Sequence, residues 1–166
     1  LKNNGTTDPS CNLKDLMENC EDIILLTGNY TNFFGKLFNQ NKLKDIEQIL
    51  KSLKNTFKNK LYIEIQRHNE FQEKNFENYL LNLSKSLKLP LIASQEVFYL
   101  YEEMYEAHDA LVCIGEKNFV DDKNRFKLSN QHYLKKNEEL KKIYSDIPEA
   151  LENNYNFHLR FNFKPK

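Results

Sequence analysis

The strictest pattern in the sequence is the alternation of apolar with polar or aromatic residues in LYIEIQ, at 61–66. A β-strand places successive side chains on opposite faces, so this segment is predicted to be a strand. Apolar residues recur every three or four positions at 43–57 and at 76–87, which predicts an amphipathic helix on each side of the strand. Short apolar runs at 22–28 and 89–94 predict two more strands. The predicted order is therefore strand, helix, strand, helix, strand.

This order predicts the α/β fold class. Alternating strands and helices favour parallel strands joined by crossover helices, in an open doubly wound sheet or in a (β/α) barrel. Polar residues on the inner side of a strand favour the barrel. Three strands are too few to close one, because about eight is usual. We therefore expect further strands upstream of Leu1 and interpret the chain as part of a longer protein.

The second half of the chain is predicted to be mostly helical. Helices are expected at 102–114, at 131–144 and from about Pro148 onward. Asp146 and Glu149 have the spacing of a capping box, and a proline is tolerated in a first helical turn.

Composition excludes several classes of protein. Lys and Arg together number 24, as do Asp and Glu, so the basic excess of a dedicated nucleic-acid-binding protein is missing. The three cysteines are odd in number and show no CxxC spacing, which argues against a disulfide framework and a zinc site. No apolar run approaches the roughly 20 residues that span a bilayer. A reducing cytoplasm is the expected location.

Several segments resemble one known family. LYIEIQRH at 61–68 is similar to YLELQRHG of the alpha subunit of bacterial DNA polymerase III, a replicative C-family polymerase. LPLIASQEVFYL at 89–100 is similar to that family's LPLVATNDVHYL, and EAHDALVCIGEKNFVDD at 106–122 to its EAHDVLLCIQTGKTLDD. Further similar stretches, in the family's order, are DIILLTG at 22–28, HYLKKNEEL at 132–140 and SDIPEALENN at 145–154.

The resemblance implies a domain assignment. Residues 1–100 correspond to the second part of a PHP (polymerase and histidinol phosphatase) domain, which is a distorted (β/α)7 barrel. Residues 101–166 correspond to its helical end, which leads toward the polymerase palm. The HxH and TDH motifs of complete PHP domains do not occur here, nor do the palm's catalytic aspartates. We therefore expect no catalytic residue in this chain, although the parent protein would synthesise DNA with Mg²⁺.

Three residues are candidates for a metal site or its remnant, and a fourth marks a lost ligand position. His68 directly follows the 61–66 strand, and metal-binding PHP domains can use a histidine there as a ligand. Glu96 replaces a ligating aspartate of the family, and Phe98 replaces a ligating histidine, so one ligand position is lost. Glu64 is a ligand, a general base or part of a structural ion pair or network, and the last is favoured. An intact PHP site would hold Zn²⁺ or Mn²⁺, whereas no bound metal is expected in this chain.

Other polar residues give weaker signals. Arg125 is the best candidate for nucleic-acid contact, although a lone arginine is a weak indication. His108 recurs in the family motif without an implied catalytic role, so helix packing or capping is its expected function. His132 and His158 are interpreted as surface or packing residues.

The resemblance leaves three functional hypotheses open. In the first, the metal site has decayed and the PHP domain docks the proofreading exonuclease subunit, beside other replicase subunits and with DNA bound through the parent protein. In the second, an intact PHP domain hydrolyses phosphoesters with metal-activated water. A stand-alone PHP phosphatase is the third, and PEALENN at 148–154 argues against it. We also expect exposed strand edges to favour self-association of the chain.

Overall fold

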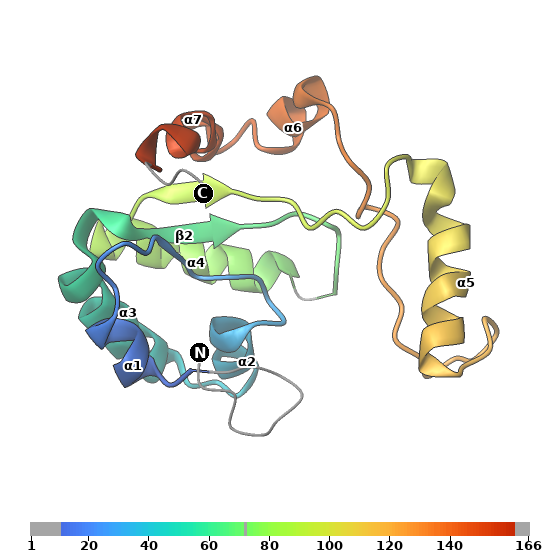
Figure 1. The fold of residues 1–166 in the computed structure, drawn as a ribbon, viewed down its shortest axis with the longest axis horizontal. Helices are drawn as coiled ribbons and strands as arrows, with labels where there is room; N and C mark the ends of the chain where they lie inside the picture. The colour runs from blue at the N-terminus through green and yellow to red at the C-terminus, as the bar shows by residue number, and fades with distance from the viewer. Residues whose placement is uncertain (1–10, 72, 162–166) are drawn as a thin grey trace, which may run out of the picture.

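One open sheet of three parallel strands organises the structure (Figure 1). The structure is a computed structural model that describes residues 11–71 and 73–161. The strands are β1 (Leu25–Leu26), β2 (Leu61–Ile65) and β3 (Leu91–Ala93), in that order across the sheet. Helices connect the strands, so the predicted α/β class is confirmed. The described strands form an open sheet and do not close a barrel.

β2 is the central strand, and both of its faces are covered. Leu61, Ile63 and Ile65 lie in the main hydrophobic core, as their alternation predicts. Tyr62 points the other way, where its ring meets Phe157 at 5.7 Å between centroids. All five residues of β2 are therefore buried, which is typical of a parallel strand.

Seven helices and three short 3-10 turns are described. α3 and α4 confirm the two predicted amphipathic helices and pack their apolar sides on the core beneath β2. Each is followed by a lysine with positive φ, Lys58 at 53° and Lys88 at 50°. The elements are α1 (Leu13–Glu18), α2 (Phe33–Asn39), α3 (Leu43–Phe57), η1 (Lys58–Lys60), α4 (Glu73–Leu87), η2 (Glu102–Met104), α5 (Tyr105–Glu116), α6 (Asn137–Ile143), α7 (Pro148–Phe157) and η3 (His158–Arg160).

The helix predicted at 131–144 is wrong in its first half. α6 begins only at Asn137, and the preceding residues are not helical. Tyr133 forms an isolated parallel bridge with Tyr99, and the N–H of Leu134 donates to the carbonyl oxygen of Tyr99 at 3.0 Å. These backbone groups are engaged by a distant segment and are not available to an i to i−4 helical ladder.

The predicted capping box is also wrong. α7 does begin at Pro148, but its N-cap residue is Ile147 and no side chain caps it. The carboxylate of Asp146 instead accepts hydrogen bonds from Arg67, at 2.6 and 2.8 Å. The Asp146 carboxylate, which the local pattern predicts to cap α7, therefore forms a long-range ion pair instead.

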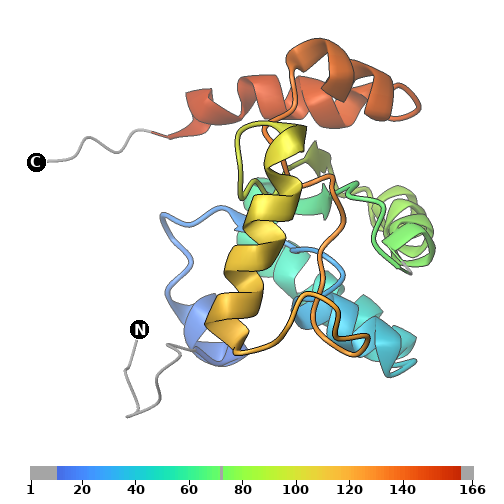
Figure 2. The same ribbon diagram turned by 90° about the vertical axis from the view of Figure 1, so that its right-hand side faces the viewer.

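α6 and α7 lie together beyond β3, on the opposite side of the sheet from α1 and α2 (Figures 1 and 2). α7 packs along β3, and the Nδ2 of Asn153 donates to the carbonyl oxygen of Leu91 at 2.7 Å. This bond occupies a backbone acceptor on the outer edge of β3. Self-association by strand pairing stays a prediction, and on this side it would require α7 to move.

No described helix is both long and apolar enough to cross a membrane. The longest, α3 and α4, have 15 residues each. Cys11, Cys20 and Cys113 are free thiols, the first exposed and the last buried. The cytoplasmic location stays a prediction.

Candidate functional site

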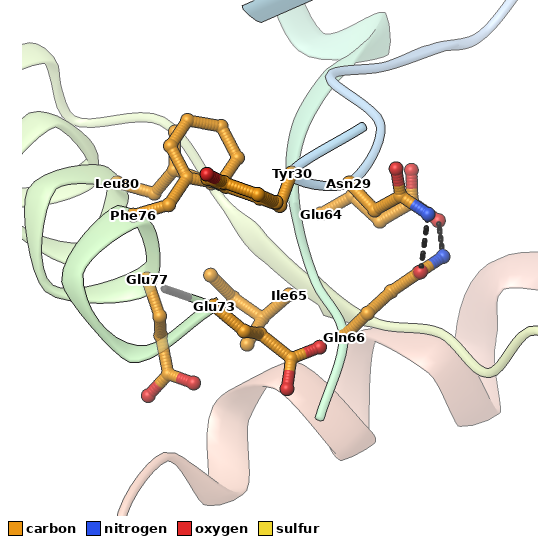
Figure 3. Close-up of a pocket in the computed structure, with 9 residues that line it drawn as sticks. All are labelled: Asn29, Tyr30, Glu64, Ile65, Gln66, Glu73, Phe76, Glu77 and Leu80. Carbon is orange, nitrogen blue, oxygen red and sulfur yellow. Dashed lines mark hydrogen bonds between the residues drawn. The ribbon is translucent and has the colours of Figure 1, made fainter. Parts of the chain in front are cut away.

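Glu64 belongs to a hydrogen-bond network at the carboxyl ends of the strands (Figure 3). Its Oε2 accepts the N–H of Gly28 at 3.0 Å, and its Oε1 accepts the Nε2 of Gln66 at 3.1 Å and the hydroxyl of Ser94. The Nδ2 of Asn29 donates to the Oε1 of Gln66 at 3.1 Å. Gly28 has φ +79°, which favours glycine, so its amide can turn toward the carboxylate. Among the described interactions Glu64 has hydrogen-bond donors but no Lys or Arg partner.

His68 is buried at the end of the segment that follows β2, with 2% of its surface exposed. The N–H of Glu96 donates to its Nε2 at 3.2 Å. Its Nδ1 lies 3.6 Å from the Oε1 of Glu73, and its own backbone N–H donates to the Oε2 of Glu73 at 2.8 Å. Because Nε2 accepts a hydrogen bond, its lone pair is engaged and the ring proton is assigned to Nδ1.

His132 is the site residue that the sequence interpretation missed. Its ring stacks on His68 with 4.2 Å between centroids and 4° between planes, and only 2% of the residue is exposed. Its Nδ1 lies 3.2 Å from the carbonyl oxygen of Glu96, and its Nε2 lies 3.2 Å from the Oε1 of Glu70. The only available signal was its place in HYLKKNEEL, one of the segments that resemble the polymerase family.

Phe98 places an aromatic ring beside this histidine pair. Its ring centroid lies 5.4 Å from that of His132 and 5.4 Å from that of His108, with the His108 ring tilted by 23°. His108 also meets Tyr99 at 5.2 Å. His108 thus packs among aromatic rings, in agreement with the expected packing role.

His68, His132 and Phe98 line a cleft of about 400 Å³ at the carboxyl ends of β2 and β3. Exposed phenylalanine rings and carboxylates share its wall, and Lys127 contributes a positive charge. The smaller pocket of Figure 3 adjoins it, with Glu73 and Glu77 reaching out from α4 on one side and the Glu64 network on the other. The polar and aromatic lining of the larger cleft includes His68, Glu70, Glu73, Glu96, Phe98 and His132.

The candidate metal residues do not fit a metal centre. The sequence named Glu64, His68 and Glu96, but the oxygens of Glu64 face three donors and the Nε2 of His68 is engaged by a backbone amide. Phe98 offers no lone pair. Across residues 11–71 and 73–161, no group of three or more His, Cys, Asp or Glu residues is arranged to hold a metal ion.

Arg125, the candidate for nucleic-acid contact, is turned inward. Its guanidinium makes two hydrogen bonds of 2.6 Å to the carboxylate of Asp109, and its Nε donates to the carbonyl of Val120 at 3.0 Å. Only 4% of its side chain is exposed. The pair lowers the pKa of the Asp109 carboxyl through the hydrogen bonds from Arg125. The guanidinium therefore holds the segment after α5 in place, and its contact with nucleic acid stays a prediction.

Arg67 ties three parts of the fold together and was also missed by the sequence interpretation. It donates to Glu77 of α4 at 2.7 and 3.0 Å, to Asp146 before α7, and to the carbonyl of Ile143 in α6. Its guanidinium carbon lies 5.0 Å from the ring centroid of Tyr144. Hydrogen bonding to Asp146 raises the pKa of Arg67, so the guanidinium stays charged.

A pH dependence of stability follows from Asp146. Hydrogen bonds from Arg67 hold the pKa of this carboxyl below its ordinary value of 3.8. Its contribution to stability is therefore full above the unfolded-state pKa and is lost as the pH falls through the lower folded-state pKa. Because 55% of the side chain is exposed, we expect a contribution of only about 0.5 kcal/mol. Urea midpoints of the native chain and Asp146→Asn, measured between pH 7 and pH 3, should converge at the acid end.

Comparison with known proteins shows which family the chain belongs to. No protein-family model matches it. It is 32% identical over 136 residues, or 82% of its length, to the DNA polymerase III subunit alpha of Caulobacter vibrioides. It is 32% identical over 146 residues to the subunit of the same name in Borreliella burgdorferi, and 31% identical over 139 residues to that of Pasteurella multocida. The chain is homologous to a segment of the DNA polymerase III alpha subunit.

The homology covers most of this chain but little of each relative. The matched segments amount to 82–87% of this chain in these three comparisons and to 12–13% of each alpha subunit. The predicted family resemblance is thereby confirmed.

Proposed function

We propose that the chain is a segment of the PHP domain of a bacterial DNA polymerase III alpha subunit and serves it as a structural and docking module. The parent protein would catalyse DNA-directed DNA synthesis in the cytoplasm, with Mg²⁺ at a palm that lies outside this chain. The expected partner is the proofreading exonuclease subunit, within the replicase.

The observation that carries the structural role is that hydrogen bonds within the chain already engage the buried polar side chains of the cleft. Two of the three side chains expected to bind metal are engaged by hydrogen bonds: the Nε2 of His68 accepts the amide of Glu96, and the carboxylate of Glu64 accepts the amide of Gly28. The described polar side chains that are fully buried all have hydrogen-bond partners. Groups that are fully paired hold loops together, whereas a metal site needs convergent free lone pairs.

The barrel assignment is supported by the arrangement of the strands. Three parallel strands with helical crossovers are compatible with one side of a (β/α) barrel, and the predicted ligand positions lie at their carboxyl ends, where such barrels place their sites. Closure would require strands from the remainder of the parent subunit.

Binding of the exonuclease subunit tests the docking role. Immobilised exonuclease subunit should retain the purified parent alpha subunit and also its isolated PHP domain. A parent subunit without the PHP domain serves as the matched control and should not be retained. Failure of a PHP domain that is folded by circular dichroism to bind would contradict the docking role.

Metal analysis separates this role from the alternative, a metal-dependent phosphoesterase. The purified parent PHP domain is expected to hold substoichiometric Zn²⁺ and Mn²⁺, unchanged by His68→Ala. Stoichiometric metal that disappears in His68→Ala would overturn the structural role and support the phosphoesterase. Glu64, Glu96 and His68 would then be its ligands, after the loop at 94–97 had moved off the imidazole.

A further inference from the structure

A group of cations lies at the amino ends of the strands, at the opposite end of the sheet from the cleft. Crossover helices return the chain to this end, where residues 58–60 join α3 to β2 and residues 88–90 join α4 to β3. η3 reaches the same end, because the Nη1 of Arg160 donates to the carbonyl oxygen of Asn59 at 2.8 Å. Figure 1 shows this end on the left, where the β2 arrow begins. We call it the basic surface, formed by Lys54, Lys58, Lys60, Lys88 and Arg160.

Backbone carbonyl groups, and not carboxylates, hold the ordered cations of the basic surface. The Nζ of Lys54 donates to the carbonyl oxygen of Leu87 at 2.6 Å, and the Nζ of Lys60 donates to the carbonyl oxygen of Glu21. A neutral acceptor fixes a side chain without cancelling its charge. Within residues 11–71 and 73–161, no cation of the basic surface forms an ion pair, whereas the two other arginines of the chain each bind carboxylates. The basic surface therefore presents unpaired positive charge in a chain whose formal net charge is zero.

An exposed aromatic ring stands beside these cations. Phe161 is 51% exposed, and its ring centroid lies 5.0 Å from that of Phe157, which packs on Tyr62. The guanidinium carbon of Arg160 lies 5.4 Å from the centroid of the same Tyr62 ring. Single-stranded nucleic acid is bound by cations that follow its phosphates and by aromatic rings on which its unpaired bases stack. The basic surface combines both kinds of group, whereas a paired base would not offer its face to the ring.

We propose that the basic surface binds single-stranded nucleic acid, with phosphates on Lys58 and Lys88 and a base stacked on Phe161. Both lysines are exposed, and neither side chain makes a hydrogen bond or ion pair in the described part of the chain, so their ammonium groups can take a phosphate. The contact lies away from the cleft and from Arg125. The inference goes beyond the proposed function and rests on it in one respect, namely that the chain lies within a longer alpha subunit.

Photo-cross-linking of the parent alpha subunit tests this inference. An oligothymidylate that carries 5-iododeoxyuridine is irradiated with the purified subunit at subsaturating concentration, and the adducts are located by peptide mass spectrometry. The halogenated base couples to an aromatic ring on which it stacks, so an adduct is expected at Phe161. Because phosphate contacts release counterions, the yield of this adduct should fall roughly ten-fold between about 50 and 200 mM salt.

Two double variants separate the basic surface from charge in general. Lys58→Glu with Lys88→Glu should lower the yield of the Phe161 adduct roughly ten-fold. Lys36→Glu with Lys44→Glu makes the same change of charge on α2 and in the first turn of α3, at the far end of that helix, and should leave the yield within about two-fold. All four lysines are exposed, and circular dichroism confirms that each variant is folded. Adducts elsewhere in the parent subunit are the internal standard.

The outcomes are distinct from those for the docking role. Absence of any adduct at Phe161 in the native subunit would overturn the inference. So would an equal loss of yield in both double variants, or an equal yield from duplex and single-stranded oligonucleotides, because neither fits phosphate contacts beside a stacked base. A salt-sensitive adduct that is lost only with Lys58 and Lys88 supports it, whether or not the exonuclease subunit binds the PHP domain.

Discussion

Replacing Arg67 by alanine is expected to lower the free energy of unfolding by about 3 kcal/mol. Glu77, whose side chain is only 4% exposed, would be left as a buried carboxylate without its main partner. The residual contact with Lys74, at 3.9 Å, comes from a lysine that is 74% exposed and compensates little. The carbonyl of Ile143 and the carboxylate of Asp146 would lose their donors in the same step. The link between α4 and the α6–α7 region would be broken.

Two further variants distinguish this geometry from charge alone. Arg67→Lys keeps the charge but lacks the planar fork, so it should recover only part of the loss. Lys51→Ala removes the exposed pair with Glu47 and should cost about 0.3 to 0.5 kcal/mol. Urea unfolding followed by circular dichroism measures all three. A cost for Arg67→Ala no greater than that of Lys51→Ala would contradict the proposed linking role.

Gly35→Ala is expected to destabilise the chain by about 2 kcal/mol or more, against helix propensity. Alanine normally stabilises a helix relative to glycine by about 1 kcal/mol. At Gly35, in α2, a Cβ would overlap the backbone carbonyl of Tyr30. A backbone group cannot swing aside as a flexible side chain can, so α2 or the turn before it must shift.

Gly115→Ala is the matched control, with the opposite expected sign. Gly115 lies in the last turn of α5, and a Cβ there would have no described atom within 4 Å. The gain should be about 0.5 to 1 kcal/mol. Midpoints of urea unfolding for both variants are compared with that of the native chain. If both substitutions stabilise, the close approach of α2 to the Tyr30 carbonyl is wrong.

Elements whose formation depends on local pattern were predictable. α3, α4 and β2 have continuous periodicity, and the core cluster contains the residues that this periodicity selects. Pro148 marked the start of α7, because a proline is accommodated in a first turn and not further along.

Elements that depend on distant partners were not predictable. The pattern at 131–136 predicts a helix, and nothing in these residues reveals the bridge between Tyr133 and Tyr99. Asp146 has the spacing of a cap, but Arg67, which captures it, lies 79 positions away. Prediction from local sequence patterns fails where a charged or backbone group binds a stronger partner that is distant in the sequence.

The position of the candidate site was predictable, but the hydrogen bonding of its side chains was not. Parallel strands bring their carboxyl ends to one edge, so Glu64, His68 and Glu96 could be expected near one another. Periodicity does not say whether their lone pairs are free, and the donors that engage them include the backbone amides of Gly28 and of Glu96 itself. His132 could be placed only once its segment was seen to run beside Phe98.

The hydrogen bond from Asn153 to the carbonyl oxygen of Leu91 makes the two edges of the sheet differ in how easily they can accept another strand. A strand from elsewhere in a longer chain could be appended beside β3 only by displacing α7, whereas no described strand occupies the outer side of β1. Any insertion or duplication that widened this sheet during evolution would thus meet least resistance next to β1. β3 is thus the edge that a helix of this chain covers, whereas the outer side of β1 is the edge left for a neighbouring strand.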